Sequence, residues 1–170
     1  MKVTLYMAMS LNGYIADQNG SEDFLSHKNW EKFCALAQEY RNFIVGRKTY
    51  GAVKNWNEGF SFDDLKGIRK VIISQDENYK LDEGYVLATS PRDALAKLQD
   101  FESVLVTGGP TINTAFIQEN LLDELILNVE PVLIGKGIPL FVQDDFSQKL
   151  YFVSSKETNG IVTLQYRVLK

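Results

Sequence analysis

Two glycine-bearing corners constrain the possible fold of this chain most, because each follows a short apolar run that is typical of a buried strand. The first is FIVGRKTY at residues 43–50, and the second is VLVTGGPT at residues 104–111. In each corner a strand is predicted to turn directly into a helix, so backbone N–H groups and the positive end of the helix dipole meet at one point. A glycine lets an anion approach the backbone there, because it has no side chain. Two such corners in one small chain predict a pair of phosphate-binding sites for a dinucleotide.

The order of the predicted elements indicates an α/β fold. Strands and helices alternate through the first two thirds of the chain, and the last third is rich in strands. This order predicts a central, mostly parallel sheet with helices on both faces. Asn159 and Gly160 are a typical turn pair, so the last two strands are expected to form an antiparallel hairpin. The predicted strands are 2–9, 42–45, 70–74, 85–88, 103–106, 124–130, 150–155 and 161–169, and the main helices are 28–40, 91–98, 110–118 and a short one from residue 49.

Composition argues against several classes of partner. The chain has 170 residues, is 45% hydrophobic and carries a formal net charge of −4, so we expect a single domain over residues 1–170 with a substantial core and no nucleic-acid partner. No segment approaches the roughly 18 consecutive apolar residues that span a bilayer, and the N-terminus lacks the pattern of a signal peptide. Cys34 is the only cysteine, which fits a reducing cytoplasm, and its apolar neighbours predict a buried structural role. We therefore expect a cytoplasmic protein with no membrane contact and no metal site.

The first corner contains an arginine that suits a phosphate. Gly46 permits a tight turn, Thr49 can bind a phosphate oxygen or cap the helix, and Arg47 offers the planar fork that recognises the 2′-phosphate of NADP. An ordinary turn with a solvated Arg-Lys pair is the alternative. Ser74 ends another predicted strand, which places its hydroxyl at the edge of the sheet where ligands bind, although a serine is also common in routine turns.

The second corner offers two consecutive glycines. Gly108 and Gly109 allow a pyrophosphate to approach the backbone closely, and Thr107 and Thr111 add hydroxyl groups. A plain tight turn into a helix is the alternative. The segment is not a Gly-x-Gly-x-x-Gly motif, and no acidic residue lies at the distance that marks a Rossmann ribose site. A phosphate site is therefore predicted without a standard Rossmann domain.

The remaining candidates concern water exclusion and proton transfer. Residues 10–20 form a loop that is expected either to close over the site or to be a mobile surface loop. His27 is the only histidine and lies in a polar stretch, which predicts exposure. Nothing in the sequence selects among the candidate carboxylates, which are Asp17, Asp23, Glu31 and Glu130.

Together the motifs resemble the dihydrofolate reductase-like superfamily, and within it the reductase domain of bacterial riboflavin biosynthesis. The resemblance covers nearly the whole chain and depends on the order and spacing of the motifs rather than on any one of them. It implies a three-layer α/β fold and an NADPH-dependent reductase. The motifs are MSLNGYIA at 9–16, VGRKTY at 45–50, VIIS at 71–74, VTGGP at 106–110, ELIL at 124–127 and PVLIGKG at 131–137.

The resemblance also implies where the parts of the cofactor lie. The nicotinamide is expected near Ala8 and Ile15, beneath the loop at residues 10–20. The other implied contacts fall on the two corners and on the strand end between them: Arg47, Thr49 and Ser74 for the adenosine side with its 2′-phosphate, and Gly108 and Gly109 for the pyrophosphate.

The implied substrate is a small heterocycle, with 5-amino-6-(5-phosphoribosylamino)uracil as the example from riboflavin synthesis. The resemblance makes Asn12 and Glu31 the candidate catalytic residues, although the riboflavin-type reductases usually have Asp where this chain has Asn12. Glu31 is the candidate for the acidic residue that dihydrofolate reductases carry on their first helix, and Trp30 is expected to fill pocket space. A folate reductase and a non-catalytic NADPH-binding module are the alternative functions. A homodimer formed through the C-terminal strands is expected by the same resemblance.

Overall fold

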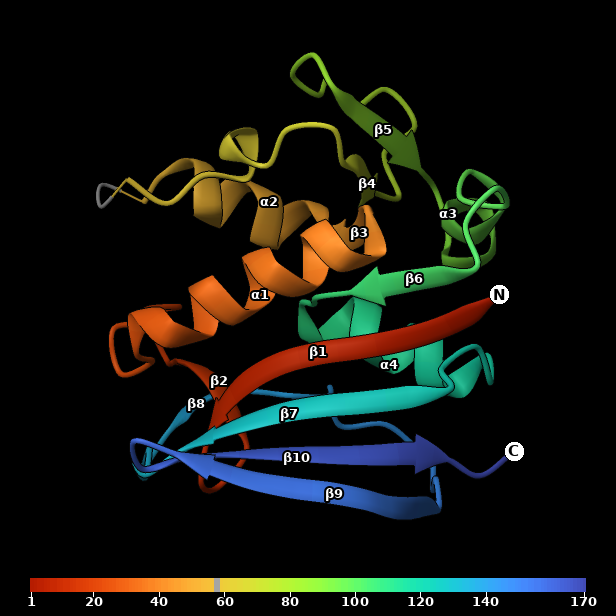
Figure 1. Cartoon of the computed structure of the whole chain (residues 1–170). Coiled ribbons are helices and arrows are strands. Elements are labelled where there is room, and N and C mark those ends of the chain that lie inside the picture. The colour runs from red at the N-terminus through yellow and green to blue at the C-terminus, as the bar shows by residue number, and fades with distance from the viewer. Residues whose placement is uncertain (57–58) are drawn as a thin grey trace.

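One eight-stranded sheet runs through the protein, whose structure is a computed structural model that describes residues 1–56 and 59–170 (Figure 1). The strand order is β5-β4-β3-β6-β1-β7-β10-β9. Strands β1 and β3 to β7 run parallel, whereas β10 is antiparallel to both β7 and β9. The predicted mostly parallel sheet with a C-terminal hairpin is therefore confirmed. The strands are β1 (Lys2–Ser10), β3 (Asn42–Gly46), β4 (Arg69–Ile73), β5 (Tyr85–Ala88), β6 (Ser103–Val106), β7 (Glu124–Glu130), β9 (Leu150–Thr158) and β10 (Ile161–Val168).

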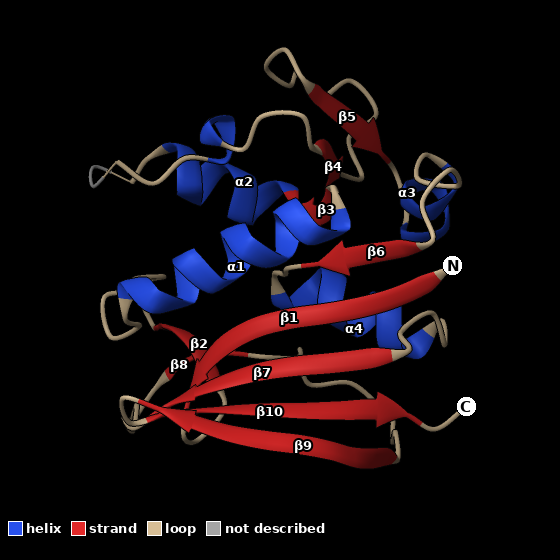
Figure 2. Ribbon diagram, viewed as in Figure 1, coloured by secondary structure: helices blue, strands red, loops and turns tan. Residues whose placement is uncertain are grey.

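Helices cover both faces of the sheet, which makes the three layers that the resemblance implied (Figure 2). Successive strand residues point to opposite faces, so Phe43 and Val45 pack in one core cluster while Ile44 packs in the other. The first cluster lies under α1 and α2, and the second lies under α3 and α4. The helices are α1 (His27–Tyr40), α2 (Arg47–Lys54), α3 (Pro91–Ala96) and α4 (Pro110–Gln118), with a short 3-10 helix, η1 (Phe62–Asp64).

Local sequence signals explain several element ends. The Ser90 hydroxyl accepts a hydrogen bond from the Asp93 N–H at 3.1 Å, and this cap starts α3 at Pro91 as predicted. Asn159 and Gly160 both have positive φ, at 54° and 84°, which is the backbone that a two-residue hairpin turn between β9 and β10 requires.

The loop at residues 10–20 contains a strand that the sequence did not reveal. Strand β2 (Tyr14–Asp17) pairs with another short strand, β8 (Gly137–Pro139), and both lie beyond the carboxyl ends of the neighbouring strands β1 and β7. A Cβ on Gly137 would lie 2.3 Å from the Ala16 carbonyl oxygen, so this close pairing requires glycine. The sequence predicts a loop throughout residues 10–20, and this prediction missed β2 because its partner strand lies far away in the chain.

Smaller differences concern boundaries and burial. Helix α2 begins at Arg47 rather than at residue 49, and β9 continues to Thr158. Cys34 is half-buried rather than buried, at the margin of the packed face of α1. Within the described part of the chain, no helix is both long and apolar enough to cross a membrane.

Candidate functional site

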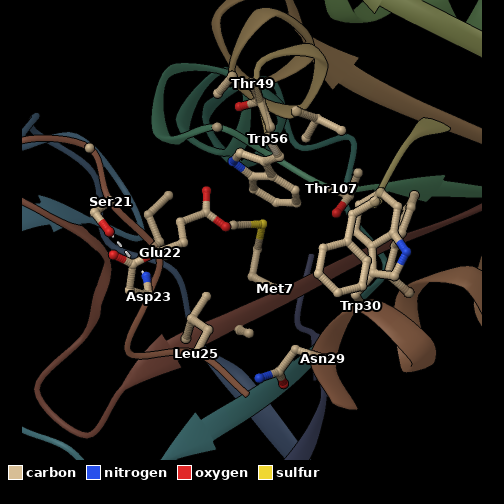
Figure 3. A pocket seen from close by; sticks show the side chains of 18 of the residues that line it. Met7, Ser21, Glu22, Asp23, Leu25, Asn29, Trp30, Thr49, Trp56 and Thr107 are labelled. Carbon is tan, nitrogen blue, oxygen red and sulfur yellow. Dashed lines mark hydrogen bonds between the residues drawn. The ribbon is translucent and has the colours of Figure 1, made fainter. Parts of the chain in front are cut away.

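A cavity of about 720 Å³ opens at the carboxyl ends of β1, β3 and β6 (Figure 3). The end of β1, the segment at residues 19–30, the first turns of α1, the helix α2 and the second glycine corner all contribute to its lining. Ligands of open α/β sheets bind at this edge, and the volume lies within the range of small-molecule sites, which is roughly 300–1,000 Å³.

The two glycine corners form one continuous surface. The Gly46 N–H donates to the Gly108 carbonyl oxygen at 2.8 Å, and the Thr107 N–H donates to the Ile44 carbonyl oxygen at 2.9 Å. The contact is tight, since a Cβ on Gly109 would lie 3.0 Å from the Thr49 hydroxyl oxygen. Gly108 has a φ of 93°, which favours glycine, and the peptide bond that follows it is cis. The corners are therefore adjacent parts of one site.

Part of the expected cofactor set lines this cavity. Ala8 and Ile15 are buried in its wall, and Thr49, Thr107 and Gly109 lie at the corner. These residues come from β1, β2, α2 and the turn after β6, and the sheet brings them together.

The other expected cofactor residues lie outside the cavity lining. Arg47 is exposed at the start of α2, and its guanidinium lies 5.3 Å from the centre of the Tyr79 ring. Ser74 is only 3% exposed, and its hydroxyl accepts a hydrogen bond from the Asp76 N–H at 3.1 Å, as a routine turn serine does. Thr111 is exposed in the first turn of α4.

Neither predicted catalytic residue lines the cavity. Glu31 is exposed on α1, because the helix turns its neighbours Asn29 and Trp30 toward the cavity instead. The Asn12 carboxamide binds the Ile134 backbone twice: its oxygen accepts from the N–H at 3.1 Å, and its nitrogen donates to the carbonyl at 2.8 Å. Asn12 therefore ties the end of β1 to the segment before β8. Neither Asn12 nor Glu31 belongs to the lining of this cavity, and a catalytic role for them stays a prediction.

Asn128 on β7 is the centre of a buried polar network below the cavity. Its side-chain nitrogen donates to the Tyr6 hydroxyl at 3.1 Å and to the Asn29 side-chain oxygen at 2.9 Å. Its oxygen accepts from the Thr163 hydroxyl at 2.7 Å. The Tyr6 hydroxyl in turn donates to the Asn29 carbonyl at 2.9 Å. The network holds the start of α1 against β1 and β7.

Glu130 completes this attachment. It is only 6% exposed, and one carboxylate oxygen accepts from the Asn29 side chain at 2.6 Å and from the Ser26 N–H at 2.9 Å. Burial, together with the negative charge of Glu130, raises the pKa of Tyr6, so this phenol stays neutral. Among the candidate carboxylates, Glu130 thus positions the helix that carries the cavity wall.

Five aromatic side chains form one side of the cavity, called here the aromatic wall: Trp30, Phe33, Trp56, Phe60 and Phe62. The rings of Trp30 and Phe62 are stacked, with centroids 5.6 Å apart and planes at 26°. Trp56 meets Trp30 edge-on at the same distance of 5.6 Å. The expectation that Trp30 fills pocket space is confirmed, and a planar ligand can lie against such a surface.

Glu22 faces the cavity and was missed by sequence reasoning. Figure 3 shows its carboxylate pointing into the cavity from the loop side, with Trp30 on the opposite side. Burial raises the pKa of Glu22 to about 7. The residue stands in a polar run, GSEDF at 20–24, which reads as a solvated loop. The pairing of β2 with β8 holds the start of that loop at the sheet edge.

A family model of the RibD C-terminal domain matches residues 1–164 of this chain. The chain belongs to the RibD C-terminal domain family. The uncharacterized protein YwjB of Bacillus subtilis (strain 168) is 30% identical, over 97% of each chain. The resemblance seen in the motifs is therefore confirmed.

Solved structures support the same fold for this RibD C-terminal domain. A protein provisionally named for riboflavin biosynthesis, from Shewanella sp. PV-4, superposes with a TM-score of 0.80 and 25% identity over the full length of both chains. The diaminohydroxyphosphoribosylaminopyrimidine deaminase/5-amino-6-(5-phosphoribosylamino)uracil reductase of Thermotoga maritima superposes with a TM-score of 0.74 and 19% identity. The match covers 99% of this chain and 56% of that one. The fold is thus that of the RibD C-terminal domain.

The remaining reactive side chains of this RibD C-terminal domain lie at the margin of the site. His27 is exposed, as expected, and its ring contacts Phe60 with centroids 4.9 Å apart. Burial raises the pKa of the Cys34 thiol, which disfavours the reactive thiolate. Among the described residues, no three His, Cys, Asp or Glu side chains are grouped to hold a metal ion.

Proposed function

We propose that this protein is an NADPH-dependent reductase of a small heterocyclic substrate. The observation that carries the proposal is a single cavity that joins the paired glycine corners to an apolar wall at the end of β1. Such a cavity has room for a nicotinamide and a second ring in contact. When bound, NADPH supplies a hydride from its nicotinamide, and the substrate ring accepts it together with a proton.

The chain's own contribution is binding, orientation and exclusion of water. Ala8 and Ile15 offer apolar surface for the nicotinamide, since both are buried in the cavity wall. The Thr49 and Thr107 hydroxyls and the backbone of Gly109 offer donors for the pyrophosphate. Because β2 is anchored by β8, the loop after β1 shields the reacting rings from water.

The 2′-phosphate of NADPH is assigned to the start of α2. Arg47 is exposed beside the corner, and Tyr79 lies under its guanidinium at 5.3 Å from the ring centre. Ser74 lies at the end of β4, next to β3 in the sheet. A planar guanidinium held on an aromatic ring is suited to a phosphate, which supports the choice of NADPH over NADH.

We extend the proposal to a homodimer that forms through β9. This strand lies at the edge of the sheet, and Tyr151, Phe152 and Val153 are 55%, 52% and 43% exposed. An edge strand with unpaired backbone groups and exposed apolar side chains is typical of a protein interface.

The experiment that tests the proposed reaction is calorimetric titration with NADPH, followed by NADPH oxidation at 340 nm with a panel of pyrimidines, pterins and aldehydes. Binding followed by oxidation supports the reductase. Binding without oxidation of any of these compounds indicates the non-catalytic module. Tight binding of methotrexate with turnover of dihydrofolate indicates a folate reductase.

A further inference from the structure

The charged side chains that line the cavity limit the charge that its substrate can carry. None of the described residues that line it is a lysine or an arginine. Its charged side chains are the acidic Glu22 and Asp23, with His27 at the margin. A phosphate monoester carries a charge of about −1.5 to −2 at neutral pH, and proteins bind it with cations or with clustered backbone donors. Thr107 and Gly109 of the lining belong to the glycine corner, which the proposed cofactor occupies, and at the start of α1 the Ser26 N–H already donates to the Glu130 carboxylate.

The aromatic wall sets the shape of the ligand. Trp30 stacks on Phe62, and Trp56 packs edge-on against Trp30, so the rings form a broad apolar surface. The Asn128 and Glu130 network fixes the start of α1 and therefore the position of Trp30. A flat ring buries the most surface against such a wall.

Glu22 supplies the polar end of the site. It is partly buried, and no hydrogen bond or ion pair joins its carboxylate to any other residue that the structure describes. A half-buried carboxylate without a partner costs free energy, and a ligand that donates N–H groups to it recovers that cost. The loop that carries Glu22 is held in place, because Asp17 accepts hydrogen bonds from the Ser21 and Asn19 N–H groups at 2.9 and 2.7 Å.

We propose that the substrate is a flat, unphosphorylated ring with N–H donors or a positive charge along one edge, whose face lies on the aromatic wall and whose polar edge contacts Glu22. This inference rests on the proposed function, because it specifies the substrate of the same site. It separates this chain from a reductase that takes a phosphoribosyl compound.

The first test compares two ligands that differ only in a phosphate group. With the protein saturated with NADP⁺, which has no hydride to transfer, calorimetry measures the binding of 5-amino-6-(ribosylamino)uracil and of its 5′-phosphate. We expect the unphosphorylated compound to bind at least tenfold more tightly. Equal or tighter binding of the 5′-phosphate would overturn the proposal.

The second test probes the edge of the ring. 2,4-Diaminoquinazoline presents N–H donors where quinazoline-2,4-dione presents carbonyl oxygens, on rings of the same shape. We expect the diamine to bind at least tenfold more tightly than the dione, and Glu22→Gln to remove most of this preference. The control is Glu39→Gln, the same change at an exposed position of α1 outside the cavity lining. This variant should keep the preference for the diamine. An unchanged preference in Glu22→Gln, measured on protein with a native circular dichroism spectrum, would contradict the role of Glu22.

Two further titrations distinguish failure of the proposed reductase function from failure of the proposed ligand class. The quinazoline pair is therefore titrated without cofactor as well, and NADPH is titrated alone. A folded protein that prefers the diamine but binds no NADPH would contradict the reductase and support the ligand class. A protein that binds NADPH but shows no preference within either ligand pair would contradict the ligand class alone.

Discussion

The Gly46 N–H donates a hydrogen bond to the carbonyl oxygen of Gly108 over 2.8 Å. This bond joins two glycine corners that are distant in the sequence, and it forms because β3 and β6 are neighbours in the sheet. The two corners that the sequence predicts as phosphate sites are thereby adjacent, as our proposal of one dinucleotide along both requires.

Replacing Gly46 with alanine should destabilise the protein. A Cβ there would lie 2.8 Å from Cγ1 of Ile112, within a well-packed contact, so we expect Gly46→Ala to lower the free energy of unfolding by about 1–3 kcal/mol. Gly51→Ala is the matched control, because Gly51 lies inside α2 with open space around the added methyl group. That change should raise stability by about 0.5–1 kcal/mol. Urea denaturation followed by circular dichroism measures both, and equal effects would refute the tight contact.

Asn128→Leu should be strongly destabilising. The change leaves the Thr163 hydroxyl and the Asn29 side-chain oxygen without the partners they have in the buried network. We expect a loss of about 2–4 kcal/mol in chemical denaturation, since buried polar groups without partners each cost about 1–3 kcal/mol. Trp30 fluorescence should change as well, because the network positions the start of α1. A loss below about 0.5 kcal/mol would show that the network contributes little net stability.

Stability should fall as pH rises through the titration of Glu22. Burial raises the pKa of Glu22 from its ordinary 4.5 to about 7, so between these values the folded protein holds a proton that the unfolded chain has released. The contribution is full below the lower value and is lost above the upper one, on the order of 1–3 kcal/mol in total. Glu22→Gln should flatten the curve between pH 5 and pH 8 relative to wild type. If the free energies of unfolding of Glu22→Gln and wild type differed by the same amount at every pH, the burial of this carboxyl would be contradicted.

Disrupting β9 should produce monomers. Phe152→Glu places a charge on the exposed edge strand, and we expect the dimer predicted for wild type to dissociate at micromolar concentration. Leu133→Glu serves as the control, since Leu133 is 70% exposed in the segment before β8 and does not belong to the edge strand. Sedimentation velocity measures the species present. A monomeric wild-type protein would end the dimer proposal at once.

Much of the fold follows from local sequence. Apolar runs located the strands of the main sheet, and Pro110 marked the first residue of α4. The pairing of β2 with β8 could not be predicted, because each strand is short and Gly137 is selected by a contact with Ala16 across the fold.

The site was harder to predict than the fold. Ala8 and Ile15 follow from the order of the motifs, and both line the cavity. Phe60 and Phe62 lie in a stretch that reads as loop, although they complete the aromatic wall. Burial of Glu22 depends on the tertiary position of its loop, and the local sequence does not predict that position.

Cofactor binding tests the central claim most directly. The measurement is the affinity of NADPH and of NADH for wild type, for Arg47→Ala and for Arg92→Ala, an exposed arginine on α3 that serves as the control. We predict that wild type and Arg92→Ala prefer NADPH, and that Arg47→Ala weakens NADPH binding by about 1–3 kcal/mol while NADH binding is unchanged. A folded wild-type protein that binds neither nucleotide, or that prefers NADH, would contradict the account.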